Sequence, residues 1–366
     1  MIESRTINVR SPLVLVALLA LIGVFAAGCG DTVSKEQGAR ERTSIGPIPD
    51  RAKADTPRVA FVPNGPASFW DIAKAGAMKA GKDFKCEVDV RIPEGGKAES
   101  QKQIIEDLIT RDFDGIAISP IDGENQTQLI NDAASKRYVI THDSDAPYSD
   151  RICCIGMDNY QAGRMCGKLV KEAIPDGGKV MIFVGRLSQD NAKGRRQGLI
   201  DELLDRSPDS TRNDPPGSLP QDGKYVILGT RTDGFDNGVA KANAEDALAR
   251  HPDIACMVGL FAYNPPMILE ALRGANKLGK VKVVAFDEAD ATLQGIKDGV
   301  VHGTVAQDPY MYGYESIRVL AAIARHDRSV IPVGGFQNIM GRQVRKDTVD
   351  AFWKQLKSRL EAARGG

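Results

Sequence analysis

The stretch "VKVVAFDEADATLQGIKDGVVHGTVAQDP", residues 281–309, contains one complete strand–helix–strand pattern. The continuous apolar run at 281–286 predicts a strand buried on both faces, as in a parallel sheet. An amphipathic stretch at 288–298 predicts a helix, and 301–305 is a second apolar run. Two parallel strands joined by a helix form a βαβ unit with a right-handed crossover. The stretch therefore predicts an α/β protein with an open parallel sheet.

The same alternation runs through the chain from residue 58 onward. Further strands are predicted at 58–62, 87–91, 114–118, 137–141, 152–155, 179–184, 224–230 and 254–258. Further helices are predicted at 68–82, 97–111, 124–135, 159–173, 191–205, 236–250, 264–277 and from Asp347 toward the C-terminus. About ten strands would be unusual in one sheet. We therefore expect two doubly wound parallel-sheet lobes, with 207–223 as a surface loop of the second.

The composition is that of an ordinary globular protein. Of 366 residues, 42% are hydrophobic and 26% are charged, and 48 basic residues balance 48 acidic ones. Nucleic-acid-binding domains usually carry a basic face, so the neutral balance argues weakly against such a partner. The six cysteines form no CxxC motif, and no Cys/His cluster has the spacing of a zinc site. We expect neither a metal nor a cofactor.

The N-terminus carries an export signal. Arg5 and Arg10 precede the apolar run "PLVLVALLALIGVFAAGC", which ends at Cys29. A basic start, an apolar centre and small residues at the end are typical of a secretory signal peptide. "AAGC" resembles the lipobox of bacterial lipoproteins, which implies a lipoprotein signal peptide at 1–28 and lipidation of Cys29. The polar residues 29–57 then predict a flexible tether. The alternative is an uncleaved membrane anchor, and both interpretations place the rest of the chain outside the cytoplasm.

Polar and aromatic residues follow the carboxyl ends of the predicted strands, where ligands of open α/β sheets bind. Phe69 and Trp70 come after the first strand, at the start of a helix. The other strand ends are followed by Asp143, Ser144, Gln189, Asn191, Arg195, Phe235, Asn264, Asp287 and Gln307. Carboxylates, amides and a guanidinium satisfy hydroxyl groups, which both donate and accept. Aromatic rings cover the apolar C–H face of a sugar. The set predicts a site for a neutral sugar or polyol.

Five stretches carry a family likeness: "PASFWDIAKAGAMKAG", "VITHDSDAP", "NAKGRRQG", "GFDNGVAKANAEDALARHPDIACMVGLFAYN" and "VVAFDEADATLQGIKDGVVHGTVAQDPYMYG". With them, nearly all of 58–345 resembles the type I periplasmic sugar-binding proteins, the ribose-binding-protein-like partners of ABC importers. The resemblance implies that the sugar contacts are Phe69, Trp70, Asp143, Arg195, Phe235, Asn264, Asp287 and Gln307. Ala67, Trp70 and Ser144 depart from the ribose pattern, so a pentose, a hexose or a polyol stays open.

The resemblance also implies an architecture and an activity. It implies an N-terminal lobe of 58–157 with 308–338, and a C-terminal lobe of 158–307 with 339–366. Three chain crossings near 157, 307 and 338 would form the hinge between them. A monosaccharide or polyol would bind between the lobes, which close by hinge rotation. We expect a monomeric protein, held at the membrane by its lipid, that passes its ligand to an ABC permease.

Each candidate residue also has a structural interpretation. Asp143 and Asp287 follow strands, where Asp commonly caps a helix. Arg195 would otherwise be a surface ion-pair partner and Phe235 a core residue. Phe69 and Trp70 would otherwise pack between helices. Asn264 and Gln307 would then be turn and hinge residues.

Other functions have to be weighed against the binding protein. A carbohydrate-active enzyme would use Asp143 and Asp287 as acid and base, but the sequence shows no GxSxG motif, phosphate loop or metal cluster beside them. A repressor of the lactose-repressor kind needs an N-terminal helix-turn-helix, where this chain has its export signal. A chemosensory sugar-binding protein that feeds a receptor would use the same pocket, and the sequence does not separate it from the importer partner.

Overall fold

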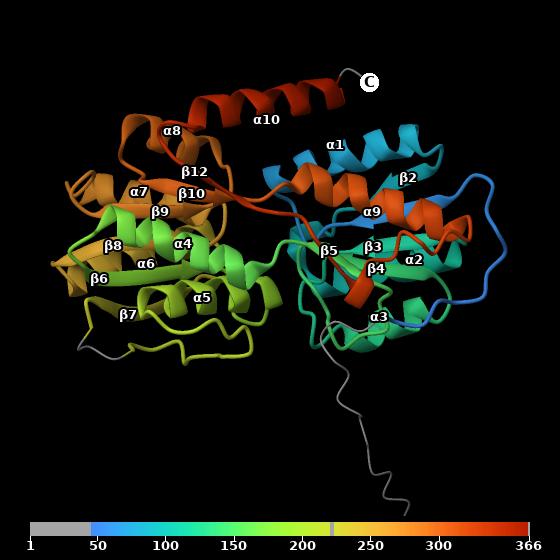
Figure 1. Cartoon of the computed structure of the whole chain (residues 1–366), viewed down its shortest axis with the longest axis horizontal. Coiled ribbons are helices and arrows are strands. Elements are labelled where there is room, and N and C mark those ends of the chain that lie inside the picture. Colours follow the sequence, from blue (N-terminus) through green and yellow to red (C-terminus); the bar gives the residue numbers. More distant parts are fainter. Residues whose placement is uncertain (1–44, 220–222, 365–366) are drawn as a thin grey trace, which may run out of the picture. The chain divides into compact units, whose positions relative to one another are not determined.

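The structure of the protein, a computed structural model, describes residues 45–219 and 223–364 (Figure 1). The predicted signal peptide, Cys29 and the first part of the predicted tether lie outside the described residues. The described strands form two six-stranded sheets. We call the sheet that contains β1, with its helices, the first lobe, and the sheet that contains β6, with its helices, the second lobe. The predicted fold class, two parallel-sheet α/β lobes, is confirmed.

In the first lobe all strands run parallel, in the order β11-β5-β4-β3-β1-β2. The strands are β1 (Arg58–Val62), β2 (Glu87–Val90), β3 (Gly115–Ile118), β4 (Tyr138–His142), β5 (Cys154–Gly156) and β11 (Phe336–Asn338). The helices are α1 (Ser68–Asp83), η1 (Glu94–Gly96), α2 (Ala98–Thr110), α3 (Thr127–Ala134), α9 (Pro309–Ala324) and η2 (Val333–Gly335).

Helices cover both faces of this sheet, which explains its continuous apolar strands. Along β1, Val59 and Phe61 pack into one core with residues of α1 and α9. Ala60 and Val62 pack into a separate core with residues of α2 and α3. Successive side chains of a strand point to opposite faces. A strand that is covered on both sides therefore has to be apolar at every position.

The second lobe repeats this plan, in the order β12-β10-β9-β8-β6-β7. Its strands are β6 (Gly178–Val184), β7 (Tyr225–Thr232), β8 (Ile254–Gly259), β9 (Lys282–Phe286), β10 (Gly303–Ala306) and β12 (Arg342–Val344). Its helices are α4 (Asn159–Ala173), α5 (Asp190–Leu203), α6 (Asn237–Arg250), α7 (Asn264–Gly274), α8 (Asp290–Asp298) and α10 (Val349–Arg364). Only β12 pairs antiparallel within this sheet of the described chain.

Two glycines let α4 and α5 pack unusually close together. A Cβ atom on Gly163 would stand 2.1 Å from the backbone oxygen of Arg195, and one on Gly198 would stand 1.9 Å from that of Tyr160. Both distances are far below van der Waals contact, so only glycine fits. The close approach sets the backbone of Arg195 directly against α4, which matters for the site described below.

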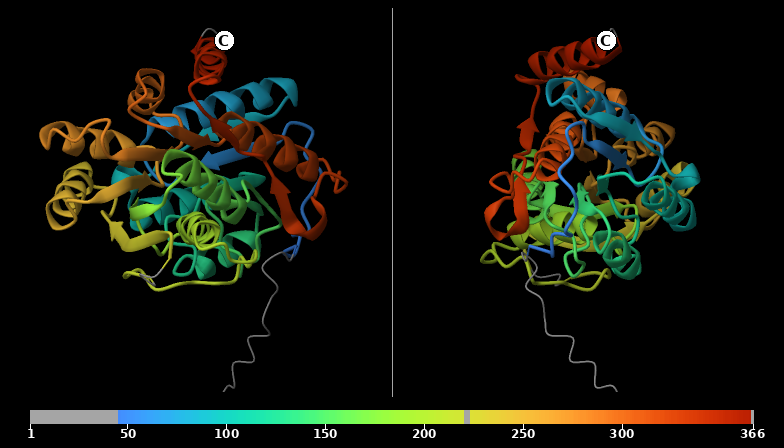
Figure 2. Two further views of the ribbon diagram at one scale, coloured as in Figure 1. Left: turned by 60° about the vertical axis from the view of Figure 1, so that its left-hand side comes forward. Right: turned by 90° about the vertical axis from the view of Figure 1, so that its right-hand side faces the viewer.

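The chain passes between the two sheets three times: from β5 to α4, from β10 to α9, and from β11 to β12. Helix α10, the last element of the chain, also lies beside α1 of the first lobe (Figures 1 and 2). Among the described elements, α9, β11, β12 and the two short helices η1 and η2 were not predicted. The two strands have three residues each, which is too short for an alternating pattern to show. No described helix is long and apolar enough to cross a membrane.

The last part of the predicted tether packs against the first lobe. The backbone N–H of Gly46 donates to the carbonyl of Arg151 at 2.9 Å, and that of Ala54 to the carbonyl of Ala324 at 2.9 Å. Between them, Arg51 lies 3.3 Å from the carboxylates of Asp112 and Asp114. Backbone hydrogen bonds of this kind leave no pattern in the sequence, so residues 45–57 read as tether although the structure holds them on the lobe.

Candidate functional site

Arg195 on α5 is the centre of a buried polar cluster that both lobes build. Only 1% of the side chain is exposed. Its Nε donates to Oδ1 of Asn159 at 2.9 Å and its Nη1 to the carbonyl of Leu260 at 3.1 Å. The guanidinium also lies over the ring of Phe286, with 4.3 Å from Cζ to the ring centroid. These contacts fix the orientation of the guanidinium before any ligand binds, and they exclude the surface ion pair as its role.

Two carboxylates flank this guanidinium, one from each lobe. Oδ1 of Asp143, beyond the end of β4, lies 3.8 Å from Nη2 of Arg195, and Oδ2 of Asp287, beyond the end of β9, lies 4.0 Å from Nη1. These distances are too long for direct hydrogen bonds. The arrangement leaves both carboxylates with unused acceptor capacity while holding them within the field of one cation.

Burial sets the electrostatics of the two carboxylates. It raises the pKa of Asp143 to about 6, against the opposing effect of Arg195, and the nearby Asp287 raises it further. Burial likewise raises the pKa of Asp287, again opposed by Arg195. Neither residue caps a helix: α8 begins at Asp290 after the cap residue Ala289, and the element after Asp143 is a strand. The capping interpretation is therefore wrong for both.

Amides and hydroxyls complete the cluster. Asp143 accepts from Oγ of Ser119 at 3.3 Å and from Nδ2 of Asn191 at 3.5 Å. Nε2 of Gln307 donates to Oδ1 of Asp287 at 2.6 Å, and Oε1 of Gln307 accepts from the hydroxyl of Tyr312 at 2.8 Å. Predicted residues from four separate strand ends thus lie in one place.

Several buried polar atoms of the predicted site residues and their neighbours have no hydrogen-bond partner among the described residues, including Nη2 of Arg195, Oε1 of Gln189, Oγ of Ser144 and Oε2 of Glu288. Buried polar groups in folded proteins are nearly always hydrogen-bonded, and an unpaired one costs about 1–3 kcal/mol. An unpaired donor such as Nη2 of Arg195, beside the carboxylate of Asp143, is a group that a ligand hydroxyl can satisfy.

Phe69 and Trp70 lie at the start of α1, almost completely buried. They are 9% and 3% exposed, and their rings meet edge to face with centroids 4.8 Å apart. Nε1 of Trp70 donates to Oδ1 of Asn64 at 3.1 Å, and its ring lies against His142, whose pKa burial lowers to about 3. Phe69 lies close to the cluster, because its ring centroid is 6.2 Å from that of Tyr312, whose hydroxyl donates to Gln307. Phe69 is thus nearer to the polar groups, whereas Trp70 supports it from the first-lobe core.

The remaining aromatic candidate, Phe235, stands on the second lobe with 40% of its surface exposed, so its core interpretation is wrong. It has a positive φ of 71° and packs edge to face on Phe261. The buried Asp233 holds this region together, because it accepts from the backbone N–H of Phe235 at 2.9 Å, from Nδ2 of Asn264 at 2.8 Å and from the hydroxyl of Tyr263.

Asn264 differs from its predicted role. Its Oδ1 accepts from the backbone N–H of Phe261 at 3.1 Å, and its Nδ2 is bonded to Asp233. Both ends of the amide therefore already have partners within the second lobe. The structure places it as a support of the aromatic loop, and its predicted ligand contact stays a prediction.

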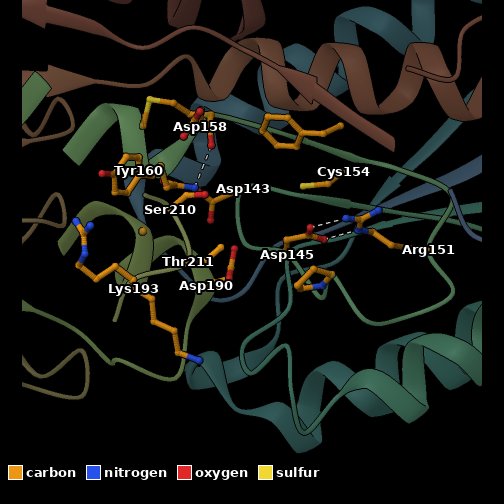
Figure 3. A pocket seen from close by; sticks show the side chains of 16 residues that line it. Asp143, Asp145, Arg151, Cys154, Asp158, Tyr160, Asp190, Lys193, Ser210 and Thr211 are labelled. Atoms are coloured by element: carbon orange, nitrogen blue, oxygen red, sulfur yellow. Dashed lines mark hydrogen bonds and ion pairs between the residues drawn. The ribbon is translucent and has the colours of Figure 1, made fainter. Parts of the chain in front are cut away.

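A pocket of about 260 Å³ adjoins the cluster, and both lobes line it (Figure 3). Asp143, Asp145 and Arg151 come from the first lobe, and Lys193 and Thr211 from the second. Of the predicted contact residues only Asp143 lines this pocket. Asn191, Arg195, Asp287 and Gln307 lie in the packed cluster instead, so only one predicted contact residue faces the open space. Within the described ranges, no group of three or more His, Cys, Asp or Glu is placed to hold a metal ion.

Sequence reasoning missed several residues of the cluster. Ser119 directly follows the predicted strand 114–118, and Asp233 comes soon after 224–230, so the strand-end rule should have included both. Asn159 follows a chain crossing, and Tyr312 lies in the unpredicted helix α9. Those two carried no comparable signal.

Comparisons with known proteins show the family to which the chain belongs. A family model described as a periplasmic binding protein domain matches residues 59–328. The ribose import binding protein RbsB of Salmonella typhimurium is 26% identical over 265 residues, which are 71% of this chain and 82% of that protein. The D-ribose/D-allose-binding protein of Pseudomonas aeruginosa is 27% identical over 267 residues, 69% of this chain and 77% of that protein. A solved solute-binding protein of Burkholderia graminis in complex with D-arabinose has a TM-score of 0.72 and 27% identity, and the match covers 82% of this chain and 98% of that one.

Proposed function

This chain belongs to the periplasmic binding protein family, and from that premise we propose that it captures a neutral sugar or polyol outside the cytoplasm and delivers it to an ABC importer. Similar proteins are named for ribose and allose, and a similar solved protein holds D-arabinose. All three ligands are small, uncharged and rich in hydroxyl groups. A site for such a ligand needs acceptors and donors on several sides of one small space.

The cluster around Arg195 is the observation that carries this proposal. One cation stands between two carboxylates of different lobes, at 3.8 Å and 4.0 Å, too far for direct hydrogen bonds. Sugar hydroxyls that accept from Arg195 and donate to Asp143 and Asp287 would replace these long contacts with short, charge-assisted bonds. Because the groups come from both lobes, the same ligand would bind the lobes to each other.

Closure of the lobes by hinge rotation at the three chain crossings is part of the proposal. Two contacts between the lobes support this closure. Nε2 of Gln189 lies 3.4 Å from the carbonyl oxygen of Ile121, and Nζ of Lys193 lies 3.3 Å from Oε1 of Glu124. Each joins the second lobe to the first beside the cluster. Closure would exclude water, which strengthens the hydrogen bonds to the ligand.

Anchoring follows from the N-terminal signals. The family implies an extracytoplasmic location, and we propose that signal peptide 1–28 directs export and that Cys29 carries a lipid. The described end of the predicted tether, residues 45–57, packs on the first lobe. Expression of Cys29→Ser beside the parent chain tests the lipid anchor, because the variant should leave the membrane fraction. We further expect a monomer, which light scattering of the lipid-free form measures.

Thermal shift followed by calorimetry, with a panel of pentoses, hexoses and polyols, tests the binding function. At a hundredfold excess over Kd a ligand stabilises the folded state by about 2.7 kcal/mol, so the melting temperature should rise by several degrees. A panel in which no sugar or polyol changes the melting temperature would contradict the proposal.

We propose that the protein returns its ligand unaltered. The cluster surrounds Arg195 with hydroxyl-binding groups, and Asp143 and Asp287 share that cation instead of standing free as acid and base. Overnight incubation with the best ligand, followed by NMR, should show only the starting sugar. Product formation that disappears in Asp143→Asn would show an enzyme.

A further inference from the structure

The pocket beside Asp143 continues the buried cluster on one side. Asp143 belongs to both, since it lines the pocket and faces Arg195. Asn159 also lines the pocket while its Oδ1 accepts from Nε of Arg195. A sugar held by Arg195 and Asp143 would therefore have one edge toward this pocket, and Figure 3 shows Asp143 at the pocket wall.

The pocket is larger than a narrow water-filled gap between the two lobes. It has a volume of about 260 Å³, and a neighbouring pocket of about 260 Å³ shares Asp145, Pro147, Lys193 and Thr211 with it. Ligand sites for small molecules have volumes of roughly 300–1,000 Å³. The volume of the two pockets together lies in this range, and it does not include any space for a sugar unit inside the cluster.

The wall that encloses the pocket is held in place by a buried network. Residues 207–223 were predicted as a surface loop, and Asp201, fully buried on α5, fixes the start of this loop from behind. Its carboxylate lies 2.6 Å from Nη1 of Arg212 and accepts from the hydroxyl of Tyr160 at 2.7 Å. That hydroxyl in turn accepts from the backbone N–H of Asp209 at 2.9 Å.

A second buried side chain holds the far part of the same segment. Arg196, only 2% exposed, donates to the carbonyl of Asp214 at 2.8 Å and to Oγ1 of Thr230 at 2.7 Å. Burying two charged groups to hold a loop has a cost in desolvation free energy. The result is that Ser210, Thr211 and Arg212 stand as a fixed wall of the pocket.

The charges of the lining select a neutral occupant. Its three cations already have carboxylate partners: Arg151 pairs with Asp145 at 2.5 Å, Lys193 with Glu124 at 3.3 Å, and Arg212 with Asp201 at 2.6 Å. The lining also includes Asp143, Asp158 and Asp190. A phosphate or carboxylate group would meet these acids with no unpaired cation to offset them. The hydroxyl of Ser210 and the carboxylate acceptors suit a neutral hydroxylated group instead, and Oγ1 of Thr211, which donates to Oδ1 of Asp209 at 2.6 Å, can still accept.

We propose that this pocket is a second subsite, and that the ligand is a sugar carrying a neutral hydroxylated substituent, such as the second unit of a disaccharide. The inference rests on the proposed sugar-binding function and names its substrate class. The first unit binds at the Arg195 cluster, and the glycosidic bond passes Asp143. The second unit occupies the space between Thr211 of the second lobe and Pro147 of the first.

Calorimetry with matched ligands tests the subsite in the wild-type protein: glucose, galactose and xylose against cellobiose, lactose, melibiose and xylobiose. We expect at least one disaccharide to bind tenfold or more tightly than either of its component sugars. If a free monosaccharide binds tightly and no disaccharide binds more tightly than its component sugars, the subsite is overturned and the proposed function still stands. If no sugar of either size binds, the proposed function and the subsite both fail.

A pair of loop variants adds an independent measurement. Thr211→Trp places a large ring in the pocket, and Ser218→Trp adds the same bulk at an exposed position of the same loop, outside the lining. We expect Thr211→Trp to reduce the affinity ratio of disaccharide to monosaccharide at least tenfold, and Ser218→Trp to leave it unchanged. An unchanged ratio in folded Thr211→Trp would overturn the subsite, and melting curves establish that both variants are folded.

Discussion

The two neighbouring parts of the interlobe region, the packed cluster and the open pocket, are built in opposite ways. In the cluster, the charged groups of Arg195, Asp143 and Asp287 face each other directly, at distances too long for hydrogen bonds. In the pocket, the cations Arg151 and Arg212 are each paired with a carboxylate at the wall or behind it. The cluster therefore keeps unused hydrogen-bonding capacity, whereas the pocket keeps unused space.

This difference separates two tasks. Unused donors and acceptors supply the strength of binding, because each short bond formed to a ligand removes the penalty of a buried unpaired group. A space whose wall groups are already paired selects by shape, because a ligand that fills it gains contacts and one that is too large does not fit. Variants of the cluster should therefore change affinity for all ligands, and variants of the pocket should change preference among them.

The largest effect is expected for Arg195→Ala. Removal of the guanidinium takes away the charge-assisted hydrogen bonds to the ligand, and truncating one partner of a buried charge pair costs about 2–5 kcal/mol of binding. Affinity for every ligand should fall more than about a hundredfold. Calorimetry measures it, and Arg231→Ala is the matched control, since Arg231 pairs with Asp246 away from the site. Retained affinity in folded Arg195→Ala would remove the cluster from the binding site.

Asp287→Asn should have the second largest effect. The amide keeps the shape but offers one acceptor oxygen in place of two, and it repositions Gln307, whose Nε2 donates to Asp287 at 2.6 Å. We expect a loss of about 2 kcal/mol, roughly thirtyfold in affinity. The melting temperature without ligand should not fall, because burial raises the pKa of Asp287 and so disfavours its charged form in the folded protein. Lower apo stability with full affinity would make Asp287 a structural residue.

The pH dependence of binding should include Asp143, whose pKa burial raises to about 6. Burial also raises the pKa values of Asp287 and Glu288, so comparison with Asp143→Asn separates the part that belongs to Asp143. Only the carboxylate accepts from two hydroxyls, so protonation competes with the ligand. Affinity should fall about tenfold from pH 7 to pH 5. His142 does not titrate in this window, because burial lowers its pKa to about 3. Calorimetry at several pH values measures the effect, and a profile that stays unchanged in Asp143→Asn would assign it to another group.

The stability of the unliganded protein should respond to pH with the opposite sign at this residue. The folded-state pKa of Asp143 lies above its ordinary value of 3.8, so the folded protein binds the proton more tightly. That contribution to stability is complete below pH 3.8 and is lost as the pH rises through about 6. The apo wild type should therefore lose stability relative to Asp143→Asn between pH 5 and pH 7, while its ligand affinity rises.

The alternation of apolar strands and amphipathic helices was sufficient to predict the fold class. It works because strands such as β1 are covered on both faces, so burial appears directly in the sequence. It failed at β11 and β12, which have three residues each. It also failed at residues 45–57, where hydrogen bonds from Gly46 and Ala54 do not depend on side-chain type.

The candidate site was predictable where chemistry follows a strand end. The rule brought together Asp143, Arg195, Asp287 and Gln307, which the structure places in one cluster. It could not predict which polar groups would find partners inside their own lobe, as Asn264 does with Asp233. It also gave no sign of the pocket, because the Asp201 network that fixes its wall joins α5 to a loop with no periodic pattern.

The smallest effect is expected at the aromatic side of the cluster. Trp70 is 3% exposed and packs against Phe69 and His142, so it supports the wall more than it touches the ligand. Trp70→Phe should weaken binding only a few-fold, far less than Arg195→Ala. In Trp353→Phe, where Trp70 is the single tryptophan that remains, ligand should still change the fluorescence, since closure alters the polar surroundings of the ring. A hundredfold loss in folded Trp70→Phe would show instead that the ring itself contacts the sugar, and the division between a polar cluster that binds and an aromatic wall that supports would have to be given up.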